Sequence, residues 1–221
     1  MSLTSYVDAY CERVDPGFWS EPLNALTNAG FALAAWLLWR SLQHSRAQGA
    51  RIPPDIAALP ALLLLIAACS FAFHTLALVW AGLADQLSIL LFGCVFLFGF
   101  LRRVAGLATW ISLAAAVLFS LASYFTPGLL PPGFLNQSGA YFPYMVGLLG
   151  MTIYLRQQER PCWRAFLGAT ILFCCALTLR TVDRSACVLI PIGTHFIWHL
   201  LNAIVLFWLS NTLSREATRG R

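Results

Sequence analysis

Residues 56–79 read IAALPALLLLIAACSFAFHTLALV, a run without a single Asp, Glu, Lys or Arg. About 20 consecutive apolar residues cross the hydrocarbon core of a bilayer as a helix. The other structure that lipid permits, a closed β-barrel, needs strands that alternate polar and apolar residues, and this run does not alternate. The whole chain has the same character, because 59% of its residues are hydrophobic and 10% are charged, whereas about a quarter of a soluble domain is charged. The sequence therefore predicts an all-α membrane protein.

Six further apolar runs predict a bundle of seven transmembrane helices. Pro127-Gly128 and Pro131-Pro132-Gly133 are expected to break the chain between the fourth and fifth helices. The fifth and sixth runs are short, so we expect their helices to extend into flanking polar residues. Residues 21–213 then form a single transmembrane domain, between an extracytoplasmic segment 1–20 and a cytoplasmic tail 214–221. The predicted spans are Glu21–Leu42, Ile56–Val79, Leu83–Leu101, Val104–Phe125, Ala140–Leu155, Trp163–Leu179 and Thr194–Leu209.

The arginines predict the orientation of this bundle. All fourteen basic residues are arginine, and eleven of them lie after odd-numbered helices, while Arg13, Arg180 and Arg184 lie on the other side. The positive-inside rule then places the amino terminus outside and the carboxyl terminus in the cytoplasm. Residues 1–20 are neither basic nor apolar, so they do not predict a signal peptide. We expect a multi-pass protein of a bacterial inner (cell) membrane, without a nucleic-acid partner or an obligate protein partner.

Three histidines interrupt the apolar runs, whereas His44 falls in a loop. An ionisable residue inside a span costs roughly 2.5–3.5 kcal/mol on insertion scales, so each one is a functional hypothesis. His195 and His199 are four residues apart and share one helix face. In the predicted orientation they lie in the first turns of the seventh helix, at the depth of His74 near the outer end of the second. Three neutral imidazoles with one open position are the ligand set of a catalytic zinc.

Two further polar residues reach the same depth. Asp85 opens the third helix at its outer end, and Ser70 lies one turn below His74. The alternative is that each intramembrane histidine is a hydrogen-bonded packing residue. Haem fits poorly, because bis-histidine haem takes its ligands from facing helices. The seven cysteines contain no CxxC pair that would indicate a cysteine zinc cluster. Three histidines and a carboxylate at one depth favour the metal site.

The arrangement of these residues resembles a known family. Ser70-x3-His74, Asp85 and His195-x3-His199 resemble the pattern of the alkaline ceramidases. That family belongs to a superfamily of seven-helix membrane hydrolases (CREST), with the adiponectin- and progestin-type receptors and the haemolysin III-like proteins. The stretch EPLNALTN at residues 21–28 is similar to the start of the first helix in the ceramidase branch, and Tyr10-Cys11-Glu12 is similar to its upstream motif.

The resemblance implies a zinc-dependent amidase that cleaves ceramide or a related N-acyl lipid to a fatty acid and an amine. His74, His195 and His199 would hold zinc, and Asp85 and Ser70 would complete the catalytic site. Tyr144, or Tyr141 beside it, is a candidate hydrogen-bond donor, although both also suit an interfacial aromatic belt. Two alternatives stay open. The substrate is a different amide or ester lipid, or the chain is a receptor-like member with structural zinc.

The amino-terminal segment raises two further expectations. The eukaryotic-type ceramidases carry calcium there, and Asp8, Glu12, Asp15 and Glu21 supply oxygen ligands of the kind calcium takes. Ala9 stands where the family has an aspartate, so a solvated acidic segment is the equal alternative. Cys11 and Cys187 both fall on the outer side, where a disulfide can persist. A bridge between them is a hypothesis.

Overall fold

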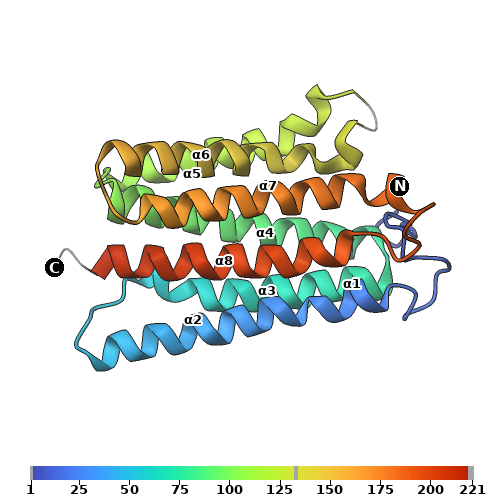
Figure 1. Ribbon diagram of the computed structural model, residues 1–221, viewed down its shortest axis with the longest axis horizontal. Coiled ribbons are helices and arrows are strands. Elements are labelled where there is room, and N and C mark those ends of the chain that lie inside the picture. The colour runs from blue at the N-terminus through green and yellow to red at the C-terminus, as the bar shows by residue number, and fades with distance from the viewer. Residues whose placement is uncertain (1, 132–133, 219–221) are drawn as a thin grey trace.

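The protein is a bundle of seven long helices that run side by side (Figure 1), which confirms the predicted all-α fold. The structure, a computed structural model, describes residues 2–131 and 134–218. A short helix α1 (Pro22–Thr27) leads into the bundle, a π-helical turn η1 (Phe100–Val104) extends α4, and a 3-10 segment η2 (Phe134–Tyr141) precedes α6. The seven long helices are α2 (Ala29–Ala47), α3 (Pro54–Leu76), α4 (Val79–Gly99), α5 (Thr109–Leu129), α6 (Phe142–Gln157), α7 (Trp163–Ala186) and α8 (His195–Thr218).

Five segments are long and apolar enough to cross a bilayer, namely α3, α4 with η1, α5, α7 and α8. Helices α2 and α6, with 19 and 16 residues, lie alongside these segments in the same bundle, at its lower and upper edges in Figure 1. Residues 2–20 lie at one end of the bundle and the last turn of α8 lies at the other (Figure 1), as an odd number of crossings requires. The chain is therefore a multi-pass integral membrane protein.

Several helix boundaries differ from the predicted spans. Helix α5 begins at Thr109 rather than Val104, because the π-helical turn and Gly106, whose φ is +74°, occupy the intervening residues. The prediction that Pro127-Gly128 breaks the chain is wrong, since α5 continues to Leu129. Proline removes one i→i−4 hydrogen bond, and only Gly128 and Leu129 follow Pro127 in the helix, so no longer helical segment is interrupted. Pro132 and Gly133 lie outside the described residues.

The helices that begin or end in polar residues extend beyond their apolar runs. Helix α7 ends at Ala186 instead of Leu179, and α8 ends at Thr218 instead of Leu209, so it enters the segment predicted as the tail. Helix α6 likewise reaches Gln157. The expectation that the fifth and sixth helices extend into flanking polar residues is confirmed. Hydropathy indicates the part of a helix that suits lipid. The backbone hydrogen bonds of the helix continue beyond that part into polar residues.

The end of the bundle that holds residues 2–20 is called the site end below. There the segment pairs with the α3–α4 turn, where the Val7 amide donates to the Ala77 carbonyl at 2.8 Å and the Val79 amide donates to Ser5 at 3.0 Å. Among the residues described, the one β-bridge joins Tyr6 to Leu78 in this region. A disulfide links Cys11 to Cys187, which confirms the hypothesis. The amino-terminal segment is thus fixed to α3, α4 and the α7–α8 connection.

Candidate metal centre

Three histidines meet at the site end of the bundle. His74 comes from the last turn of α3, and His195 and His199 come from the first two turns of α8. One ring nitrogen of each lies within 4.8 Å of those of the other two. The three side chains are 1–2% exposed, so no bulk water competes for their lone pairs. The prediction that these residues meet at one depth is confirmed.

The ring orientation of His74 is set by Glu21, the residue before α1. His74 Nδ1 donates a hydrogen bond to Glu21 Oε2 at 2.6 Å, which leaves His74 Nε2 buried and without a partner. The other side of the carboxylate accepts a hydrogen bond from Arg13 Nε, and Asn24 Nδ2 donates to Oε2 at 2.9 Å. A histidine that donates one ring N–H to a carboxylate presents the other nitrogen as a metal ligand.

His199 is oriented in a similar way by a hydroxyl group. Thr27 Oγ1 donates to the Leu23 carbonyl at 2.7 Å, so it accepts from His199 Nδ1 at 3.0 Å. This fixes the proton on Nδ1 and leaves Nε2 of His199 with its lone pair free. Both Thr27 and Glu21 belong to the chain around α1, so this short helix positions two of the three imidazoles.

His195 is positioned through the backbone. Asp183 Oδ1 accepts hydrogen bonds from the amides of Thr194 and His195, at 2.7 and 2.9 Å, and therefore caps the amino terminus of α8. Asp183 Oδ2 accepts from the Cys11 amide at 2.9 Å. Gly193, with φ +67°, is required next to this cap, because a Cβ there would lie 2.2 Å from Asp183 Oδ1. The Asp183 carboxylate, on α7, thus connects the start of α8 at His195 to the disulfide-bonded Cys11.

The ring of Tyr10 covers the imidazole of His195. The two rings stack with centroids 3.6 Å apart, and Nδ1 of His195 is buried without a hydrogen-bond partner. Burial raises the pKa of the Tyr10 phenol well above its usual value, even though the charge of Arg180 opposes this, so the phenol stays neutral. The amino-terminal segment therefore forms one wall of the cluster.

These features fit a metal ion. Buried polar atoms normally find hydrogen-bond partners, yet Nε2 of His74 and Nδ1 of His195 have none among the described residues. Neighbouring acceptors orient two of the three imidazoles, those of His74 and His199, and three converging imidazoles form a donor set for a divalent transition metal. We conclude that His74, His195 and His199 could hold one.

Ser70 and Asp85 line the small cavity beside His195 and His199. Ser70 is buried on α3, one turn from His74, and Asp85 lies on α4. Asp85 Oδ1 is buried and has no hydrogen-bond partner within the described part of the chain. The structure therefore brings the predicted serine and aspartate next to the histidines, with a carboxylate oxygen free to accept a proton or a hydrogen bond.

The two candidate tyrosines lie in different places. Tyr141 is buried and lines the cavity with Asp85 and Ser70. Tyr144, the residue favoured from the sequence, packs on Phe119 with ring centroids 4.7 Å apart and does not line that cavity. The sequence could not separate them, because both fall in the region where η2 becomes α6, and the change from 3-10 to α geometry decides which ring faces the histidines.

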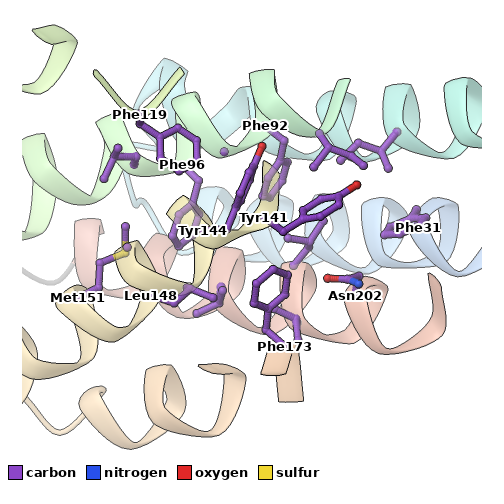
Figure 2. Close-up of a pocket in the computed structure, with 18 of the residues that line it drawn as sticks. Phe31, Phe92, Phe96, Phe119, Tyr141, Tyr144, Leu148, Met151, Phe173 and Asn202 are labelled. Carbon is purple, nitrogen blue, oxygen red and sulfur yellow. The ribbon is translucent and has the colours of Figure 1, made fainter. Parts of the chain in front are cut away.

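An apolar pocket continues from the site into the bundle (Figure 2). Tyr141, Phe31 and Trp198 line both this pocket and the cavity at the histidines, so the two adjoin. The hydroxyl of Tyr141 points toward the end of the pocket marked by Phe31, and Met151 lies at the opposite end (Figure 2). The walls between them come from α4, α5, α6, α7 and α8 and are almost entirely apolar. The pocket suits a hydrocarbon chain.

The four predicted calcium ligands are not brought together. Glu12 accepts from the amides of Leu23 and Asn24, Asp8 pairs with Arg184, and Asp15 accepts from the Gly17 amide. The oxygen atoms that do converge surround a guanidinium group, since Arg13 donates to the Asp15, Gly17 and His74 carbonyls as well as to Glu21. The side chain of Arg13 is buried, so this segment already contains its own cation.

Several residues that shape the site were not predicted from the sequence. The sequence predicts a loop at Arg180 and Asp183, because the apolar run ends at Leu179. Thr27 and His199 are 172 residues apart in the sequence, so no sequence spacing links them. A signal was present for Asp183, since a carboxylate in a segment bounded by two predicted helices is a common partner of a helix amino terminus.

Comparison with known proteins agrees with the geometry. A sequence model described as Ceramidase matches residues 2–215. A search of curated proteins gave no matching relative. The match covers both ends of the metal centre, from the amino-terminal segment to α8.

Proposed function

Because this chain belongs to the ceramidase family, we propose that it is a zinc-dependent lipid amidase that cleaves ceramide or a related N-acyl lipid within the membrane. The observation that carries this proposal is the junction of three features. Three buried imidazoles, a free carboxylate oxygen on Asp85 and an apolar pocket meet at one point between the helices. A purely structural metal site would have no need of the last two.

The reaction adds water across an amide. A zinc ion held by His74, His195 and His199 would act as a Lewis acid and lower the pKa of a water molecule to about 7. Asp85 accepts a proton from the attacking water and returns it to the leaving nitrogen. The acyl carbon gains a bond to oxygen and loses its bond to nitrogen, so the products are a fatty acid and an amine.

Two hydroxyl groups are available for the carbonyl oxygen as it gains negative charge. Ser70 lines the cavity beside Asp85 and would donate to this oxygen. Tyr141 lines the same cavity and would be the second donor. Hydrogen bonds aimed at the developing charge stabilise the transition state more than the substrate, which is the condition for a faster reaction.

The proposed substrate position follows from the polarity of the walls. The acyl chain would lie in the apolar pocket between Phe31 and Met151, with the amide at the histidines. The amine half would then lie toward the site end, where polar groups line the cavities. The site end would face the extracytoplasmic side of a bacterial inner membrane. The Cys11–Cys187 disulfide supports this orientation, since such bonds persist in oxidising compartments.

The test is fatty-acid release by the purified protein in detergent, from a panel of N-acyl lipids that includes ceramides. We expect release that stops on removal of metal and in the His195→Ala variant. The ranking of the panel would identify the amine half. Zinc bound in stoichiometric amount without release from any lipid would contradict the amidase and favour a receptor-like protein with structural zinc.

A further inference from the structure

Arg180 is a buried charge that forms no direct ion pair within the described part of the chain. It lies on α7 inside the bundle and is 8% exposed. No carboxylate lies within 4 Å of its guanidinium group among residues 2–131 and 134–218, and Asp85, which lines the same cavity, lies beyond that distance. A buried charge is normally paired, and an arginine at membrane depth is costly. The protein therefore keeps a cation here that no carboxylate of the described residues contacts directly.

The guanidinium has one occupied edge and one largely open edge. Nη1 donates to Ser138 Oγ at 2.7 Å and to the Asn136 carbonyl at 3.3 Å, which fixes the side chain against η2. Nη2 makes a long contact of 3.4 Å with the Tyr10 hydroxyl, and Nε has no hydrogen-bond partner among the residues that the structure describes. Nε and Nη2 form the side of the fork that binds the two oxygens of a carboxylate.

The position of Arg180 separates it from the acyl chain. It lines the cavity of His195 and His199 and two further hollows, one between α4 and η2 and one beneath the amino-terminal segment, where Gln86 also lies. It does not line the apolar pocket. With an acyl chain in that pocket and the amide at the histidines, Arg180 faces the amine half of the molecule.

We infer that Arg180 binds a carboxylate on the amine half of the substrate, so that the preferred substrates are N-acyl amino acid lipids rather than neutral amides. This inference rests on the proposed amidase function. The carboxylate would complete the fork at Nε and Nη2 and supply the missing counter-ion. The rings of Tyr10, Tyr141 and Trp198, 5.0–6.0 Å from the guanidinium, exclude water from the pair and strengthen it.

The experiment compares two isosteric substrates, N-dodecanoylglycine and N-dodecanoylglycinamide, which differ in one negative charge. We expect the wild-type protein to prefer the acid by roughly 10- to 100-fold in kcat/KM, the range for a hydrogen-bonded charge. Arg180→Gln should bring the ratio close to one, and Arg180→Lys should restore part of it. Arg184→Gln, an exposed arginine one turn along α7, is the matched control and should keep the wild-type ratio.

Binding gives a readout that does not need turnover. The Kd values of both compounds for the zinc-loaded wild type and the Asp85→Asn variant should show the same preference. If no amide is hydrolysed but the acid still binds more tightly through Arg180, the amidase fails and the carboxylate site stands. Equal kcat/KM and equal Kd for the two compounds in the wild type would overturn the carboxylate site, even if Arg180→Gln does not fold.

A fatty acid offers the same chemistry from another source. If Arg180 instead binds the carboxylate of the released fatty acid, dodecanoate should bind the wild type more tightly than Arg180→Gln, while the two glycine compounds turn over equally. That result would overturn the assignment to the amine half. A purely structural role for Arg180 would lower the activity toward both substrates by the same factor and leave their ratio unchanged, which would overturn it as well.

Discussion

Replacement of Glu21 by glutamine tests whether the orientation of His74 matters for metal binding. The two carboxylate oxygens serve different donors, since Oε1 accepts from Arg13 and Oε2 accepts from His74 Nδ1 at 2.6 Å. An amide has one acceptor oxygen and one NH₂ group, so one of these two donors must face another donor. If the NH₂ faces His74, the imidazole must move its proton to Nε2, which is the atom needed as a ligand.

The expected size of the effect follows from that conflict. Loss of an outer partner of a metal-bound histidine weakens metal affinity by roughly 10- to 100-fold, or about 1.4–2.8 kcal/mol. We therefore expect the zinc Kd of Glu21→Gln to rise by that factor. Glu21→Asp keeps the charge and shortens the side chain by one methylene. Its zinc Kd should lie between those of the wild type and Glu21→Gln. Zinc affinity is measured by competition with a chromophoric chelator in detergent, and circular dichroism reports the helix content.

The matched control is Asp8→Asn, which removes an exposed carboxylate paired with Arg184 in the same amino-terminal segment. Its zinc Kd should stay within about twofold of the wild-type value, because exposed ion pairs contribute little. A folded Glu21→Gln protein with the wild-type zinc Kd would refute the reasoning, since it would show that His74 does not need its carboxylate partner to bind metal.

Three further changes test other parts of the structure. Asp85→Asn should leave zinc bound and lower kcat for fatty-acid release by several orders of magnitude, and wild-type turnover would remove Asp85 from the mechanism. Cys11→Ser should lower the free energy of unfolding by about 2–4 kcal/mol in thermal melts, and the double variant with Cys187→Ser should lose no more. Gly147 lines the apolar pocket, and a Cβ there would meet no atom within 4 Å. Gly147→Leu should therefore shorten the preferred acyl chain by roughly two to four carbons, because the leucine fills that many methylene volumes. Gly150→Leu, outside that pocket, should keep the wild-type chain preference.

The sequence predicted the parts of the fold that depend on hydropathy. Long apolar runs located each of the seven helices. In lipid, a single chain segment can satisfy its backbone hydrogen bonds internally only as a helix, so a long apolar run predicts one. The runs did not locate the helix ends. Helix α7 continues past Leu179 through Arg180 and Asp183, whose side chains face inward and not toward lipid. Hydropathy averages over all faces of a helix, so it cannot detect polar residues that are buried against other helices.

The sequence likewise predicted only some residues of the candidate site. The three histidines were predictable because an imidazole inside an apolar run has few structural reasons to be there. Their supporting residues were not, because Thr27 and Asp183 act on His199 and His195 across more than ten residues of sequence or across helices. For Glu21 the sequence suggested calcium, and the structure shows its carboxylate between Arg13 and His74 instead. Residue type limits what a side chain can bind, but only the fold decides which partner it meets.

The amino-terminal segment therefore belongs to the candidate metal centre. Tyr10 stacks on His195, Cys11 binds Asp183 through its amide, and Arg13 joins Glu21 to the carbonyl of His74. Each of the contacts connects residues outside the predicted spans to one of the metal ligands or to its positioning group. The Cys11–Cys187 disulfide fastens the same segment beside α8, so a loss of the bond should displace Tyr10 and Arg13 together. Reduction of this disulfide should then raise the zinc Kd as well as lower the free energy of unfolding. A disulfide remote from the site would affect only the free energy of unfolding.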